Sequence, residues 1–370
     1  MCLRRNQTFA ALASADRLAK PARVLYCCCM SNPHLSAETR SILRQGTGVV
    51  IPLYLPANSQ RAASETLVSD TVEAFVEIVD DPQHICISVD GKACGADTAE
   101  KLARQFSTSL VVAPENRGKL QGAVNGLREL SAHGNLSWFA VVDQDGDHFA
   151  NELANLLRAG LHITRTAASD RVLVIGRRAS RHRPMGWLRG ELEELADRVL
   201  LDALHYHATT SGHPLCLEFS AALEEFPDFH SGYKLFSRAT ADAVATAVPQ
   251  PLDLPDSCYY QHAVEAVLVV EAILAGALIG AVNRSTFDEQ PVSVFGQFNR
   301  EQLVADKIIW PCRRLGIPAD FVMQWMANHA ARLLLGTLLP DGRNELLAIR
   351  RLVAEACGTQ PDNPVRSLFV

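Results

Sequence analysis

Three aspartates within five residues are the part of this sequence best suited to chemistry. Asp143, Asp145 and Asp147 follow an apolar run, 138–142, whose composition is typical of a buried strand. Carboxylates so close in sequence repel one another, and a bound cation relieves that repulsion. Oxygen ligands favour Mg²⁺ or Mn²⁺. We therefore predict a divalent metal at the end of a strand, placed to bind a diphosphate.

Two other interpretations of this segment need to be weighed. An EF-hand loop has glycine at its sixth position and glutamate at its twelfth, whereas here Gly146 is fourth and Ala154 is twelfth. The sequence therefore excludes an EF-hand. A solvated Asp-Gly turn remains open as long as this segment is considered alone.

The composition is that of a globular protein. The chain has 370 residues, of which 48% are hydrophobic and 21% charged, enough for one large domain or two small ones. A net charge of −6 argues against a nucleic-acid-binding protein, which needs a basic surface. Ten cysteines without a Cys-x-x-Cys pair indicate a reducing, cytoplasmic setting. The apolar segments 263–282 and 321–339 carry charged side chains, so we expect no transmembrane span.

From about residue 47 the pattern alternates between strand and helix. We expect strands at 48–54, 85–89, 110–112, 138–142, 171–175 and 277–282, and helices at 67–79, 98–106, 118–130, 151–161, 190–207 and 258–275, with 229–238 short and irregular. This order predicts an α/β fold with a mostly parallel sheet flanked by helices. Ligands bind such sheets beyond the carboxyl ends of the strands, where Asp90 and Asp143 both fall.

The two ends of the chain differ from this middle part. We expect an N-terminal extension at 1–46, a sheet-containing domain at 47–295 and a C-terminal helical region at 296–370. The last region contains helical patterns at 301–315, 318–338 and 343–357, followed by a loose end from 358. These helices could cover part of a ligand site or join two chains in a homodimer.

Six segments resemble, in the same order, those of family 2 glycosyltransferases, which act on nucleotide sugars and have the GT-A fold. The segments are 49–52, 88–91, 115–119, 143–148, 174–178 and 230–238. The aspartate segment resembles the longer Asp-x-Asp form of polyprenyl-phosphate (dolichyl-phosphate) mannosyltransferases. The resemblance covers roughly residues 48 to 240 and implies a GT-A domain with a C-terminal helical extension.

The resemblance also implies an activity. It is the metal-dependent, inverting transfer of a single sugar from a UDP- or GDP-sugar to an acceptor hydroxyl, amine or phosphate. The acceptor could be a small molecule, lipid-linked or carrier-bound. The donor-binding residues implied are Pro52, Tyr54, Asp90, Asn116, Lys119, Asp143, Gln144, Asp145, Arg177, Ser231 and Gly232, and the Mn²⁺ or Mg²⁺ ligands are Asp143, Asp145 and Asp147.

An acceptor hydroxyl or amine must lose a proton during transfer, whereas a phosphate acceptor needs no base. We take Asp228 and Glu265 as candidate bases, although ordinary surface carboxylates explain both nearly as well. Arg181 and Arg183, beyond Arg177, are expected to be solvated.

The sequence departs from the family in two places. The Gln-x-x-Arg-Trp helix of processive synthases is not reproduced at Gln324-Trp325, so processive synthesis is not expected. Many lipid-linked members carry transmembrane segments after the catalytic domain, and their absence here weighs against a polyprenyl-phosphate acceptor. A nucleotidyltransferase is an alternative, but residues 53–56 lack its glycine-rich loop. A non-catalytic sugar-nucleotide-binding protein is another, and the intact aspartate cluster counts against it.

Overall fold

The computed structural model describes residues 36–56, 61–220, 227–250, 252–288, 299–333 and 342–360. Contacts divide the chain into residues 1–36 and a compact unit from Ala37 to Val370, and the helices and strands of the described residues lie in the second unit. The expected boundary near residue 295 and the loose end from 361 onward lie outside the described residues.

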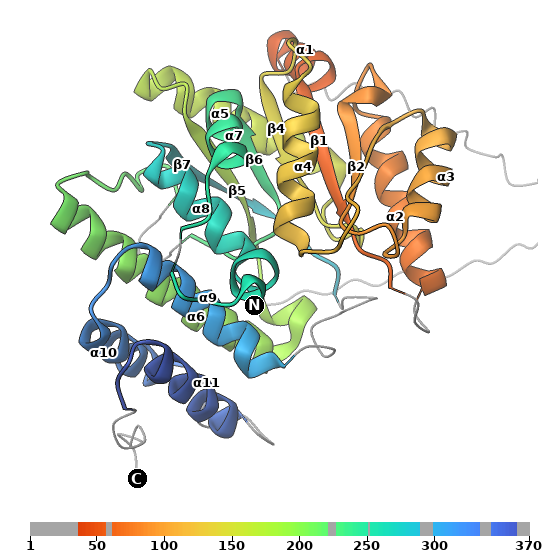
Figure 1. The fold of residues 1–370 in the computed structure, drawn as a ribbon. Helices are drawn as coiled ribbons and strands as arrows, with labels where there is room; N and C mark the ends of the chain where they lie inside the picture. Colours follow the sequence, from red (N-terminus) through yellow and green to blue (C-terminus); the bar gives the residue numbers. More distant parts are fainter. Residues whose placement is uncertain are drawn as a thin grey trace, which may run out of the picture. The chain divides into compact units, whose positions relative to one another are not determined.

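A sheet of seven strands forms the centre of this unit (Figure 1). The strands are β1 (Thr47–Leu53), β2 (Ile85–Val89), β3 (Ser109–Val112), β4 (Trp138–Val141), β5 (Val172–Arg178), β6 (Lys234–Ser237) and β7 (Leu278–Arg284). Their order is β3-β2-β1-β4-β6-β5-β7. Of these strands only β6 runs antiparallel to its neighbours, β4 and β5. The predicted α/β fold with a mostly parallel sheet is confirmed.

Helices flank the sheet. They are α1 (Ala37–Gln45), α2 (Arg61–Val76), α3 (Ala96–Phe106), α4 (Lys119–Ser131), α5 (Leu153–Ala167), α6 (His182–Ser211), α7 (Arg238–Thr246), α8 (Val264–Leu274), α9 (Arg300–Arg314), α10 (Ala319–Ala330) and α11 (Gly342–Ala356). Short turns η1 (Pro82–His84), η2 (Ala150–Glu152) and the π-helical η3 (Cys258–His262) complete the described elements.

Both faces of the sheet are buried, as the sequence of β1 requires. Successive side chains of a strand point to opposite faces. Val49 and Val50 are therefore on different faces, and both are fully buried. Val50 belongs to a core that also contains apolar residues of α4, α6, α8 and α9. Such continuous apolar strands are typical of parallel sheets covered on two sides.

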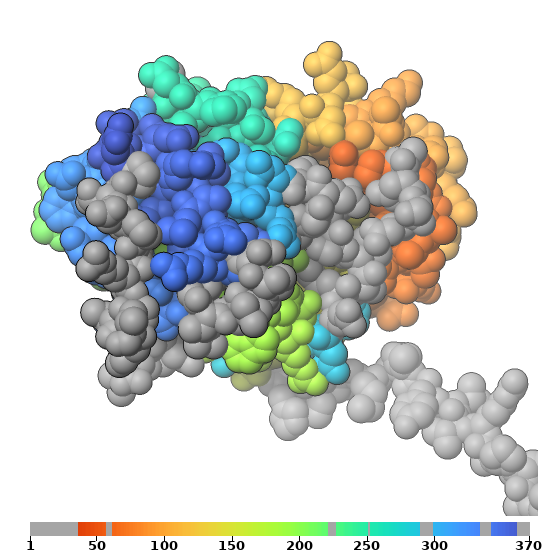
Figure 2. Space-filling view, turned by 90° about the horizontal axis from the view of Figure 1, so that it is seen from below, coloured from red at the N-terminus to blue at the C-terminus, as the bar shows by residue number. Residues whose placement is uncertain are grey.

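The C-terminal helices continue this same core. Helix α9 packs against α6, α10 also packs against α6, and α11 packs against α9 (Figure 1). Figure 2 shows these helices, in blue, on the face seen from below. Trp310 and Ile308 of α9 are buried in the core that reaches Val50 of the sheet. The helical region is thus packed onto the sheet-containing part within the described residues.

The structure differs from the expected elements in four places. Residues 229–238 contain strand β6, and the irregular segment predicted there was wrong; four residues are too short to give a clear alternating pattern. The predicted helix 190–207 is longer, because α6 starts at His182 and continues across a kink at Gly186. The predicted helix 258–275 is split into η3 and α8. Helix α1 lies within the expected N-terminal extension.

Helix α4 lies unusually close to the sheet because of Gly126. A Cβ atom at this position would lie 2.3 Å from Val50 Cγ1, far inside van der Waals contact. The close approach fixes the start of α4, which carries Lys119, beside the ends of β1 and β2.

We predict that Gly126→Ala destabilises the protein. Over-packing at a rigid helix–sheet contact costs about 1–3 kcal/mol in the free energy of unfolding. Gly134→Ala is the matched control, because a Cβ there would meet no atom within 4 Å. Urea unfolding of both variants measures the difference. Equal stabilities would show that α4 does not depend on this contact.

Candidate functional site

The polar residues singled out in the sequence gather at one edge of the sheet. The carboxyl ends of the parallel strands β1, β2, β4, β5 and β7 lie there. Because β6 is antiparallel, its first residue, Lys234, pairs with Val141 at the same edge, and the loop before it also lies at this edge. The edge borders a cavity of about 430 Å³.

Most of the predicted site residues line this cavity. They are Pro52, Tyr54, Asp90, Asn116, Lys119, Asp143, Gln144, Asp145, Asp147, Gly232 and Glu265. Three others, Arg177, Ser231 and Asp228, are described in the structure but are not among the lining residues. Arg178 takes the place in the lining that was expected for Arg177.

Asp90 fixes the loop that leads into α4. Its carboxylate accepts hydrogen bonds from the backbone N–H groups of Arg117, at 3.1 Å, and Gly118. Gly118 has φ +137°, and a Cβ there would lie 2.3 Å from the Tyr260 carbonyl oxygen, so glycine is required. Burial raises the pKa of Asp90 despite these bonds. A carboxylate has about four acceptor positions, which leaves some for a ligand.

Lys119 joins the aspartate segment to helix α8. Its ammonium Nζ lies 2.6 Å from Asp143 Oδ1 and 2.7 Å from Glu265 Oε1. Burial works against the charge of Lys119, but the two carboxylates hold its pKa above the usual value. Burial alone would raise the pKa of Glu265, yet Lys119, Lys234 and Lys307 lower it to about 2. Glu265 is therefore a weak proton acceptor in this arrangement.

The other two aspartates of the segment have different surroundings. Asp147 is buried, with Oδ2 3.1 Å from Arg284 Nη1 and Oδ1 accepting the Phe287 N–H at 2.7 Å. Asp145 is half-buried, and its Oδ1 accepts only the Asp147 N–H, at 3.2 Å, among the described residues. Burial and the nearby Asp143 carboxylate raise the pKa of Asp145 to about 6. Asp143 is paired with Lys119 and Asp147 with Arg284, so within the described residues Asp145 is the aspartate of the segment without an ion pair.

Gly232 allows the aspartate segment and the loop before β6 to touch. A Cβ at Gly232 would lie 2.4 Å from Asp143 Oδ2. On the other side of the segment, the Gln144 amide forms two hydrogen bonds with the Tyr54 backbone, from Tyr54 N–H at 2.7 Å and to Tyr54 C=O at 2.9 Å. The aspartates are therefore fixed to β1 and to β6 at once.

The geometry around Asp228 is that of a structural ion pair. Arg178 Nε donates to Asp228 Oδ2 at 2.8 Å, Nη2 donates to Oδ1 at 2.6 Å, and the Arg178 backbone N–H adds a third bond. Burial opposes ionisation, but Arg178 holds the pKa of Asp228 well below its usual range. With both oxygens committed, Asp228 is poorly placed to accept a proton, and this geometry supports a positioning role instead of the predicted base.

Several cavity residues could not have been identified from the sequence. Glu193 comes from α6, Lys307 comes from α9, and Arg284 comes from the end of β7. Lys307 Nζ lies 3.3 Å from Glu193 Oε1, although the two are separated by 114 residues in the chain. No local pattern marks either residue. The expected solvation of Arg181 was also wrong, because its Nη1 lies 2.7 Å from Asp197, which is fully buried.

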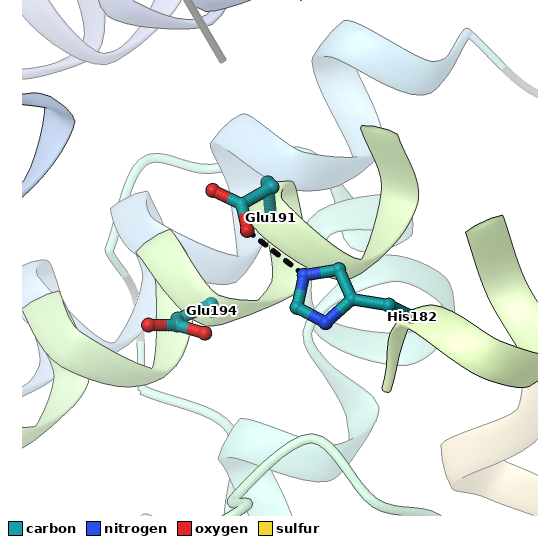
Figure 3. A group of neighbouring side chains, drawn as sticks. All are labelled: His182, Glu191 and Glu194. Carbon is teal, nitrogen blue, oxygen red and sulfur yellow. Dashed lines mark hydrogen bonds and ion pairs between the residues drawn. The ribbon is translucent and has the colours of Figure 1, made fainter. Parts of the chain in front are cut away.

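A second acidic group needs to be separated from this cavity. Within the described ranges, His182, Glu191 and Glu194 are the one group of three histidine, cysteine or acidic side chains whose ligand atoms all lie within 4.8 Å (Figure 3). His182 Nε2 is already 2.8 Å from Glu191 Oε1, and Glu194 is bound by Arg198 at 2.6 Å. Each of the two glutamates therefore already has a hydrogen-bond partner in the described structure.

No helix in the part of the chain that the structure describes is long and apolar enough to cross a bilayer. Comparison with protein-family models and with curated protein sequences gives no match. Among solved structures, the chain is similar to residues 1–349 of S. aureus TarS, with a TM-score of 0.44 and 11% identity over 84% of this chain and 81% of that chain. A likeness this low carries no argument about activity, which must come from the site itself.

Proposed function

We propose that this protein is a metal-dependent glycosyltransferase that moves one sugar from a UDP- or GDP-sugar to an acceptor with inversion. The observation that carries the proposal is the convergence of Asp90, Lys119 and the Asp143–Asp145 pair on one cavity at the carboxyl edge of the sheet. This edge is where α/β folds bind nucleotides. The sequence resemblance to GT-A enzymes supports the same assignment.

The donor set fits a hard divalent cation. Asp143 and Asp145 offer carboxylate oxygens at the cavity, the ligands that Mg²⁺ and Mn²⁺ prefer. Burial, and after it the nearby Asp143 carboxylate, raises the pKa of Asp145, and a bound cation would relieve both effects. Asp147 is held by Arg284 and Phe287, so we assign it to orienting the segment, with Asp143 and Asp145 as the ligands. A bound cation would neutralise the departing nucleoside diphosphate.

The remaining residues would bind the rest of the donor. Asp90 would accept hydrogen bonds from the nucleobase with the acceptor positions that the α4 loop leaves open. Lys119 would place a positive charge beside the diphosphate while it holds Asp143 in position. Gly232 would admit the sugar close to the loop backbone, since it presents no side chain to the cavity.

The acceptor would approach from the side of α6 and α9. Pro184, Met185, Arg189, Leu303 and Lys307 line this part of the cavity. Their mixture of apolar and charged groups is compatible with a small-molecule, lipid-linked or carrier-bound acceptor.

The metal ligands can be tested by binding. Thermal unfolding in the presence of UDP, GDP, CDP or ADP, with and without Mn²⁺, should show stabilisation by one diphosphate only when metal is present. Asp145→Asn should abolish that shift, because the amide loses the negative charge that holds the cation. Asp70→Asn, on the exposed side of α2, is the control and should behave as the wild type. A full metal-dependent shift in Asp145→Asn would exclude the assigned ligand.

Gly232→Ala provides a second test that separates the site from the fold. The methyl group would displace the Asp143 carboxylate, and Lys119 would keep Glu265 as its partner, so the free energy of unfolding should change by less than about 1 kcal/mol. The displaced carboxylate should weaken metal-dependent diphosphate binding about tenfold or more. Isothermal titration and urea unfolding measure the two effects. Unchanged affinity would show that the position of Asp143 does not matter for binding.

Asp228→Ala tests whether this residue is structural. Removing one partner of a buried ion pair costs about 3–5 kcal/mol, because the buried Arg178 loses the three hydrogen bonds to Asp228 and keeps only Glu193 as a carboxylate partner. Asp80→Ala is the matched control, because Asp80 also pairs with an arginine, Arg44 at 2.6 Å, but on the surface. This variant should lose about 0–1 kcal/mol in the free energy of unfolding. Urea unfolding distinguishes the two. A stable Asp228→Ala protein that has lost only turnover would instead restore Asp228 as the base.

A further inference from the structure

Transfer to a hydroxyl or amine requires a group that takes the acceptor proton. The two carboxylates predicted for this task are both engaged elsewhere. Asp228 is bound by Arg178, and Glu265 by Lys119. The proton acceptor must therefore be sought among the other cavity residues.

His230 has the required features. It lines the cavity, and its side chain is fully buried. Its Nδ1 lies 2.7 Å from Asp197 Oδ1, which also accepts the His230 backbone N–H at 3.2 Å. Its Nε2 has no hydrogen-bond partner among the described residues. A buried ring nitrogen without a hydrogen bond costs free energy unless a ligand forms that hydrogen bond.

Asp197 fixes which nitrogen of the ring carries the proton. A carboxylate accepts but cannot donate, so Nδ1 holds a hydrogen, and in the neutral ring Nε2 is the nitrogen with the lone pair. Asp197 is itself held by Arg181, whose Nη1 lies 2.7 Å from Oδ2. The backbone bond to Asp197 fixes the histidine a second time. The arrangement orients the ring in the way that an aspartate orients a catalytic histidine.

The location is also suitable. His230 stands two residues before Gly232, the residue that contacts the Asp143 carboxylate. Two residues of extended chain span at most about 7 Å. Glu193 and Lys307 line the same cavity as His230 and come from α6 and α9, the helices assigned to the acceptor.

We propose that His230 is the catalytic base and that Asp197 is its positioning residue. This inference rests on the proposed glycosyltransferase function. The acceptor O–H or N–H proton passes to His230 Nε2 as the acceptor atom bonds to the anomeric carbon. The bond from that carbon to the donor phosphate oxygen breaks, and the nucleoside diphosphate leaves with the electron pair. The acceptor class is therefore a hydroxyl or amine, because a phosphate acceptor has no proton to give.

The test measures release of UDP or GDP from a panel of sugar nucleotides, with Mn²⁺ and with water as the acceptor. His230→Gln keeps a polar side chain of similar size, and we expect its kcat to fall by about 10²- to 10⁴-fold while KM for the donor stays unchanged. Added imidazole should restore turnover to His230→Ala, since it can occupy the vacated space and take the proton. A merely structural histidine would show neither the kcat-specific loss nor the rescue.

A matched control exists in a second histidine–aspartate pair. His329 Nε2 lies 2.6 Å from Asp202, its Nδ1 has no partner among the described residues, and it does not line the cavity. His329→Gln should keep wild-type turnover. Asp197→Asn should lower kcat as well, because the amide no longer fixes the ring, and imidazole should not rescue it.

The outcomes separate this inference from the proposed function. Wild-type turnover that is abolished by Asp145→Asn but retained by His230→Gln would overturn the base and leave the glycosyltransferase standing. Loss of metal-dependent diphosphate binding in His230→Gln would show a structural role and also overturn it. No turnover by the wild type with any sugar nucleotide would overturn both.

Discussion

Each charge buried around the cavity has to be balanced, and this constraint determines how the site is built. Lys119 lies between Asp143 and Glu265, and Arg178 lies between Asp228 and Glu193. An unpaired buried charge would cost several kcal/mol, so these pairs must form together with the fold. They connect strands β4 and β5 with helices α4, α6 and α8, and the Lys119–Glu265 pair joins residues 146 positions apart. The pairing also decides which carboxylates remain free for a ligand.

Two polar groups at the cavity lack a partner of this kind among the described residues. Lys119 offsets the charge of Asp143, but Asp145 forms no ion pair in the described ranges, and burial together with the nearby Asp143 carboxylate raises its pKa to about 6. The His230 ring has one nitrogen bonded to Asp197 and the other without a partner in the described ranges. Departures from a satisfied interior are expected where a protein binds or reacts. The aspartate carboxylate is suited to a cation that carries a diphosphate, and the histidine ring is suited to accept a proton from the acceptor.

The antiparallel strand β6 places the aspartate segment and His230 at the same edge of the sheet. In a purely parallel sheet the loop before a strand would open at the far edge, away from the ligand. Because β6 is reversed, residues 228–233 reach the carboxyl edge, where Gly232 meets Asp143 and His230 borders the cavity. Helix α9 supplies Lys307 to the same cavity, so the C-terminal helices take part in the site as well as in the core.

The sequence by itself determined the alternation of strands and helices, and therefore the parallel sheet and the edge where Asp90 and the aspartate segment lie. These features follow from local periodicity and from the polar residues that end apolar strands. Only the tertiary structure determined which of the charged and polar side chains pair with one another. Asp228 and Arg178 are 50 residues apart, and His230 and Asp197 are 33 apart. Local pattern carries no information about such pairs, because folding brings the charges together and burial then fixes which of them can act.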